Sequence, residues 1–112
     1  MVTAETALVI PLVVVLLAVC LGAMRWGIDQ VRCVDAARAG ARAAARGDTP
    51  AAVHELALRG APQGAEVTSL GTGDFVTVRV VAPLPTGIAL IEALPRPAAA
   101  ATARLEVSAG AP

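Results

Sequence analysis

The chain has 112 residues, of which 56% are hydrophobic, and its nine basic residues balance its nine acidic residues. A formal net charge of zero argues against nucleic acid as a partner, because phosphate backbones are bound through basic patches. Once an apolar N-terminal segment is set aside, fewer than about 90 residues remain, enough for one small domain. Trp26 and Phe75 are the only aromatic residues, so we expect a thin core and marginal stability for that domain.

An uncharged apolar run from Thr6 to Met24 follows directly after a single carboxylate, Glu5. As a helix, residues 7–24 span roughly 27 Å, close to the ~30 Å hydrocarbon core of a bilayer. A cleaved signal peptide is disfavoured, because no Lys or Arg precedes the run and the bulky Val19 stands before Cys20. The run predicts a membrane-spanning helix. An acid at the N-terminal end of such a helix is energetically costly unless it is paired, so we expect Glu5 to be functional.

The helix is expected to continue far beyond the apolar run. Apart from Gly27 the sequence has no strong breaker, so we predict one helix from Thr3 to Arg46, about 65 Å long, ended by residues 47–50. Pro11 lies inside this helix and should kink it, because proline removes a backbone donor and crowds the preceding turn.

The second half of the predicted helix carries an arginine row on one side and small residues on the other. Arg38, Arg42 and Arg46 recur every four residues. The opposite side carries small residues that let helix backbones approach closely: Ala36, Gly40, Ala43 and Ala44. Two interpretations stay open. The pattern is either a solvated charged stripe with alanine filler or a helix-packing seam, against the chain's own small domain or against copies of the same helix.

The remainder of the chain predicts a short helix and three strands. The helix has Pro50 in its first turn and should face Val53, Leu56 and Ala57 inward. The alternating segments predict a β-hairpin and a third strand, at residues 65–70, 75–82 and 99–107, with a Gly-rich loop at 71–74.

These elements predict an α+β fold, a long N-terminal transmembrane helix followed by a small three-stranded antiparallel sheet domain. We divide the chain into a membrane-spanning and assembly helix (1–25), its amphipathic continuation (26–47) and a small α+β extracytoplasmic domain (48–112). Trp26 is expected to anchor the helix at the membrane interface. The apolar segment from Ile88 to Leu94 is either a helical turn or a hydrophobic loop, and we expect it to contact a partner.

Residues with catalytic or metal-binding chemistry are scarce and scattered. His54 is the only histidine and stands beside Glu55 on an exposed-looking helix. No cluster has metal-ligand spacing, and Ser69 and Ser108 lack the context of a nucleophile. The glycines at 71–74 indicate a turn, not a phosphate cradle, because no helix follows them. We therefore expect no enzyme, cofactor or metal site.

The two cysteines, Cys20 and Cys33, lie on the same predicted helix about 20 Å apart. A disulfide between them within one chain is excluded if the helix is continuous. They are either small apolar packing residues or a means of pairing between subunits.

The residues from Val2 to Pro11 closely resemble the N-terminus of TadE-like minor pilins of the tight-adherence (Flp) pilus system. Residues 32–47 resemble the helix continuation in the actinobacterial branch of that family, and residues 76–80 and 103–106 also look like that branch. The first ten residues carry most of the specificity of the resemblance, since an Ala/Arg-rich stretch is weak by itself.

The resemblance implies a pilin-like fold and a role as a minor pilin or pseudopilin, a structural subunit of Tad/Flp pilus assembly. It implies a prepilin peptidase that removes a basic leader ending in Gly, so that Met1 is the first mature residue and Glu5 the acid at position five. The implied partners are the membrane, other pilin subunits, the assembly machinery and the peptidase. The implied location is the cytoplasmic membrane, single-pass with the C-terminal domain outside, or a surface pilus.

No leader stands before Met1 in the sequence, so two alternatives stay open. A leader encoded upstream would hold the N-terminus in the cytoplasm. Without one, Arg25, Arg32 and Arg38 would place the C-terminus there, because basic residues favour the cytoplasmic side. A chain that starts at Met1 would not be processed in this way.

The chemistry of Glu5 fits assembly without the family name. In lipid its carboxylate could pair with the free amino terminus of a neighbouring subunit, which would set the register between subunits. The main alternative is a single-pass membrane anchor that carries a small extracytoplasmic adaptor domain. A membrane-active peptide precursor is a third, which the hairpin signals disfavour.

Overall fold

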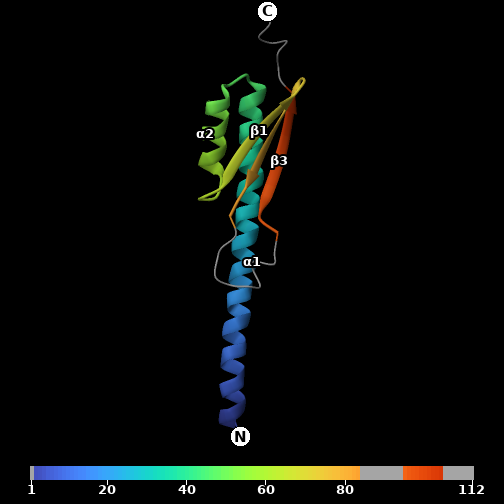
Figure 1. Cartoon of the computed structure of the whole chain (residues 1–112). Helices are drawn as coiled ribbons and strands as arrows, with labels where there is room; N and C mark the ends of the chain where they lie inside the picture. Colours follow the sequence, from blue (N-terminus) through green and yellow to red (C-terminus); the bar gives the residue numbers. More distant parts are fainter. Residues whose placement is uncertain (1, 84–94, 105–112) are drawn as a thin grey trace, which may run out of the picture.

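The computed structural model describes residues 2–83 and 95–104. In chain order its elements are α1 (Val2–Ala45), α2 (Pro50–Gly60), β1 (Glu66–Thr72), β2 (Phe75–Val81) and β3 (Ala98–Arg104). The molecule measures 83 × 18 × 18 Å, because α1 extends far beyond the other elements toward its N-terminus (Figure 1). The predicted α+β class, with a long N-terminal helix and a three-stranded antiparallel sheet, is confirmed.

Helix α1 is a single helix of 44 residues that begins and ends within one residue of the predicted bounds. Its end is formed around Gly47, whose φ is +84°. There the Gly47 N–H donates to the Ala44 carbonyl (3.0 Å) and the Asp48 N–H to the Ala43 carbonyl (3.1 Å). These paired bonds satisfy carbonyls that the helix end would leave open.

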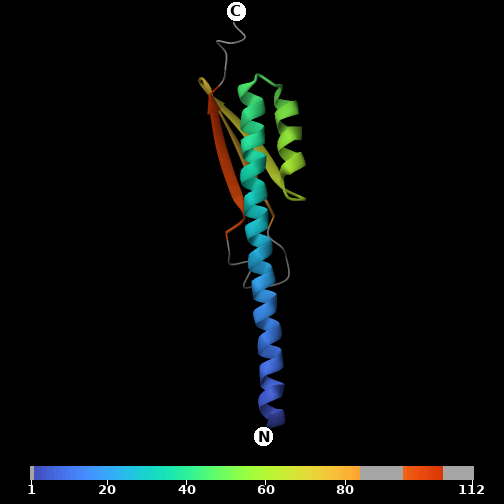
Figure 2. The ribbon, with the colours of Figure 1, turned by 180° about the vertical axis from the view of Figure 1, so that it is seen from behind.

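The kink expected at Pro11 is not visible. Pro11 lies inside α1, and the ribbon runs without a sharp bend in both views (Figures 1 and 2). The helix is nevertheless uninterrupted from Val2 to Ala45.

Helix α2 follows after a short turn and packs beside the distal half of α1 (Figure 2). The Thr49 hydroxyl caps it by accepting a hydrogen bond from the Ala52 N–H at 3.2 Å, and Pro50 occupies its first turn. Val53 and Ala57 are buried and Leu56 is half-buried against the same core, as predicted.

The sheet has the strand order β1-β2-β3, and both pairs are antiparallel. Thr72 pairs with Phe75, so the hairpin turn is only two residues long, whereas the sequence predicted a loop at 71–74. The reason is Gly73, whose φ of +61° suits the first central position of a tight hairpin turn. The third strand is confirmed as far as Arg104. Its predicted continuation to residue 107 and the segment from Ile88 to Leu94 lie outside the described residues.

The core lies where one face of the sheet covers α1 and α2. From the central strand, Val78 and Val80 are fully buried, while Phe75 on the same strand is exposed. The other buried hydrophobic residues are small or medium-sized: Cys33, Ala36, Ala37, Ala41, Ala43, Ala44, Val53, Ala57, Val67 and Ala82. Close backbone approach therefore replaces large side chains in this core.

Candidate functional site

The N-terminal half of α1 projects away from the rest of the chain. It contains an 18-residue window of mean hydropathy 2.9, and none of that window is buried. Within the described residues, α1 is the one helix that is long and apolar enough to cross a membrane. Because apolar surface on this scale is unfavourable in water, this half of α1 requires an apolar environment.

Glu5 lies in the first turn of α1 and is exposed. A carboxylate in the first turn interacts favourably with the helix dipole. Among the described residues no side-chain hydrogen bond or ion pair involves Glu5, whereas the neighbouring Thr6 hydroxyl donates to the Val2 carbonyl at 2.8 Å. Met1, the other predicted assembly residue, lies outside the described residues. Glu5 thus has no side-chain partner among the described residues.

Three side chains on one side of α1 hold the chain just before β3. The Trp26 indole N–H donates to the Pro95 carbonyl at 2.8 Å. Gln30 makes two bonds to Ala98: its amide donates to the Ala98 carbonyl and its oxygen accepts from the Ala98 N–H, both at 2.9 Å. We call these contacts the junction, because they attach α1 to the sheet domain just beyond its apolar half.

The third side chain of the junction is Cys33, which is fully buried and donates from its thiol to the Pro97 carbonyl at 3.6 Å. Burial raises the pKa of the Cys33 thiol. A backbone hydrogen bond with Ala82 lowers it, and the charge of Asp29 raises it again. Cys33 is thus a packing residue with little thiolate character, while Cys20 is exposed on the apolar half. Sequence reasoning missed Gln30. The signal for it was the spacing of Trp26, Gln30 and Cys33, which places all three on one helix side.

The predicted small-residue side of α1 lies against the chain's own elements. Ala36, Ala43 and Ala44 are 1%, 0% and 5% exposed, and Gly40 is also buried. A methyl group added at Gly40 would lie 2.9 Å from a Val78 methyl carbon and 3.3 Å from the Ala57 methyl. Gly40 therefore marks a point where α1, α2 and β2 approach closely.

The arginine row lies on the opposite, exposed side of α1. Arg38 and Arg42 are exposed, and Arg46 forms an ion pair with Asp48 at 3.4 Å. The exposed pair between Arg59 and Glu55 on α2 is 3.2 Å long, and His54 beside it is exposed too. Surface pairs of this kind contribute ~0–1 kcal/mol.

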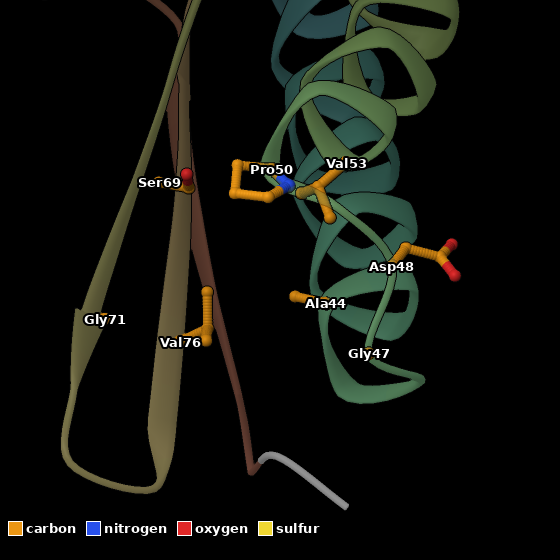
Figure 3. Close-up of a pocket in the computed structure, with 8 residues that line it drawn as sticks. All are labelled: Ala44, Gly47, Asp48, Pro50, Val53, Ser69, Gly71 and Val76. Atoms are coloured by element: carbon orange, nitrogen blue, oxygen red, sulfur yellow. The ribbon is translucent and has the colours of Figure 1, made fainter.

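A hollow of about 500 Å³ lies between the end of α1, the start of α2 and the β1–β2 hairpin. Its lining residues are Ala44, Gly47, Asp48, Pro50, Val53, Ser69, Gly71 and Val76. Figure 3 shows that the Asp48 carboxylate points away from the strands, so Ser69 stands across the hollow without an acid or base beside it. In the described part of the chain no group of three His, Cys, Asp or Glu residues could hold a metal ion.

Comparison with known proteins identifies the first 42 residues of the chain. The family model of TadE-like proteins matches residues 1–42. The chain carries a TadE-like segment. The match covers the apolar half of α1, the three α1 side chains of the junction and the first two small residues, Ala36 and Gly40. It confirms the resemblance seen in the residues from Val2 to Pro11.

A protein of Mycobacterium tuberculosis (strain H37Rv), named apoptosis inhibitor Rv3655c, is 44% identical to this chain over 78 residues. The aligned part covers 70% of this chain and 62% of that protein, so this chain spans less than two thirds of the relative. No solved structure matches the chain.

Proposed function

We propose that the TadE-like chain is a minor pilin or pseudopilin, a structural subunit of Tad/Flp pilus assembly and not an enzyme. The division of α1 carries this proposal. One continuous helix of 44 residues presents an unburied apolar half with an acid in its first turn, and its other half forms the core of the sheet domain. A subunit of this shape can stand in a membrane and later bring its apolar half into contact with neighbouring subunits.

In this proposal Glu5 sets the register of assembly. Its carboxylate is costly in an apolar environment unless a cation pairs with it, and the free amino terminus of the next subunit is such a cation. Processing by a prepilin peptidase would create that amino terminus at Met1. The sheet domain lies outside the cytoplasm and remains on the outside of the helix bundle.

The alternative is a single-pass membrane anchor that carries the sheet domain as an adaptor and is never assembled. Inhibition of apoptosis, which the relative's name states for that protein, is not part of the proposal. The TadE-like chain spans only 62% of that relative, and no contact described above favours this role.

The proposal is tested by comparing the wild-type chain with Glu5→Ala in cell membranes and in sheared surface fractions. We expect Glu5→Ala to insert normally and to be depleted from the sheared fraction, because only the inter-subunit pair is lost. Glu55→Ala is the matched control, since it removes an exposed acid whose pair with Arg59 is weak. N-terminal sequencing of the same samples, with and without the prepilin peptidase, shows whether the mature chain begins at Met1.

Two results would contradict the proposal. Wild-type protein that never reaches the sheared fraction and whose N-terminus is independent of the peptidase would favour the anchor. Glu5→Ala at wild-type levels in pili would refute the pairing role of this carboxylate.

A further inference from the structure

An exposed apolar row continues on α1 beyond the first basic residue. Met24, Ile28 and Val31 are 63%, 49% and 60% exposed, and their spacing of four and three residues places them on one side of the helix. Arg25 and Arg32 are also exposed and lie along one edge of the row. We call these five residues the lower face of α1.

With respect to residues 2–83 and 95–104, the lower face is the open side of the helix at this level. The other side is covered at the junction, where Trp26 and Gln30 hold the chain before β3. A shallow, almost entirely apolar hollow lies along the open side, lined by Met24, Gly27, Ile28, Val31 and Arg32. At Gly27 an added methyl group would meet nothing within 4 Å, so the hollow has room for a ligand chain.

The position of the lower face along α1 matches the surface of a bilayer. If the apolar run ends at Met24, Ile28 lies about 6 Å and Val31 about 10 Å further along the axis. The polar layer on each side of the hydrocarbon core is about 5–8 Å thick. Ile28 would then lie within this layer in an upright helix, and Val31 reaches it only if the helix tilts toward its open side.

We propose that the lower face binds the membrane surface, with α1 leaving the bilayer tilted toward Met24, Ile28 and Val31. Arg25 and Arg32 bind the phosphates of anionic phospholipids, while the apolar residues of the hollow contact the lipids where their acyl chains begin. The inference rests on the membrane anchoring in the proposed function. It adds the direction of the tilt and the class of lipid.

The charges around the face support a lipid partner. Among the described residues neither Arg25 nor Arg32 is in an ion pair, although Asp29 lies half-buried between them and Asp35 ends the row. Guanidinium groups are weakly hydrated and bind phosphate through two hydrogen bonds at once. A second copy fits less well, because a symmetric contact would bring the same arginines together and three apolar residues bury too little area for a stable dimer.

The test is a depth measurement on the full chain in vesicles of equal parts phosphatidylglycerol and phosphatidylcholine. In a Cys20→Ala background, a spin label is attached after Val31→Cys, with Leu58→Cys as the matched exposed control on α2 and Val14→Cys as the control inside the apolar run. Collision of each label with oxygen, which partitions into lipid, is compared with collision with a water-soluble nickel complex. The background chain must remain unlabelled, since Cys33 is fully buried.

We expect the label at position 31 to lie between the two controls, meeting oxygen more and the nickel complex less than position 58 does, but lying less deep than position 14. In pure phosphatidylcholine the label at position 31 should move toward water, and Arg25→Gln with Arg32→Gln should abolish this difference between the two lipids. A label at position 31 that behaves like position 58 overturns the proposal. Protection of position 31 from both reagents would mean that a second copy covers the face, which also overturns it.

A label at position 14 that favours the nickel complex would show that the apolar run is not in the membrane. That result would refute both the membrane anchoring and the binding of the lower face. A label that favours lipid at position 14 and water at position 31 would refute the binding of the lower face to the membrane surface, but not the anchoring of the chain in the membrane. Equal depth at position 31 in both lipids refutes the role of the arginines.

Discussion

Gly40 shows at the scale of one residue why this core has so few large side chains. It lies where α1 meets both α2 and β2, and the added methyl group would approach a fully buried valine, Val78, to 2.9 Å. Val78 cannot move aside easily, because it is enclosed between the sheet and the helices. A glycine at this point permits the close helix–sheet contact, although glycine is a poor helix former.

We predict that Gly40→Ala lowers the stability of the sheet domain. The gain in helix propensity is up to about 1 kcal/mol, while overpacking costs about 1–3 kcal/mol, so the melting temperature should fall by several degrees. Gly27→Ala is the matched control on the same helix, since open space surrounds that position and only the propensity gain applies. A higher melting temperature for Gly40→Ala in thermal unfolding would show that the contact is looser than described.

At the scale of elements, the junction determines how β3 is placed against α1. The Gln30 amide bonds the N–H and the carbonyl of Ala98 as a neighbouring strand would, although it is a side chain on a helix. The Ala82 N–H donates to the Pro97 carbonyl at 2.8 Å, so the end of β2 is tied to the same segment. The junction thus fixes the start of β3 from two directions.

We predict that Gln30→Ala loosens the start of β3 without unfolding the hairpin of β1 and β2. Loss of the two bonds leaves a partly buried N–H and carbonyl without partners, which costs about 1–3 kcal/mol. Hydrogen exchange should therefore quicken at the Ala98 amide and stay slow in the β1–β2 ladder. Gln63→Ala, at an exposed glutamine outside the helices and strands, is the control. Unchanged exchange at Ala98 would refute the role of Gln30.

At the scale of the whole molecule, the sheet domain and α1 are one packing unit. Of the twelve buried hydrophobic residues that the described chain contains, six belong to α1, from Cys33 to Ala44. The division at residue 48 that the sequence suggested would cut through this core. The unit that packs together begins near the junction at Trp26, and only the apolar half of α1 lies outside it.

We predict that a chain of residues 26–112 unfolds cooperatively in water, whereas residues 48–112 do not fold. The shorter chain loses half of its buried residues, and a sheet with no helix face to cover is unstable by itself. Circular dichroism during thermal denaturation distinguishes the two. A cooperative transition in the shorter chain would show that α2 and the sheet suffice without α1.

The sequence by itself determined the elements whose signals are local. The apolar run, the helix propensity of the Ala/Arg-rich stretch and the alternation of Val76, Val78 and Val80 predicted α1 and β2 closely, because these signals repeat within a few residues. Glu5 was likewise recognisable as the candidate assembly residue, since an acid beside an apolar run is conspicuous without any tertiary contact.

Only the tertiary structure decided what each side of α1 contacts. The small-residue side was compatible with packing on copies of the helix, and the fold places it against Val78 and Ala57 of the same chain. Trp26 was expected at a membrane interface, yet its indole donates to Pro95, 69 residues away. Contacts over such separations depend on how the whole chain closes. The spacing of Trp26, Gln30 and Cys33 places them on one side of the helix, but it does not say which distant segment they contact.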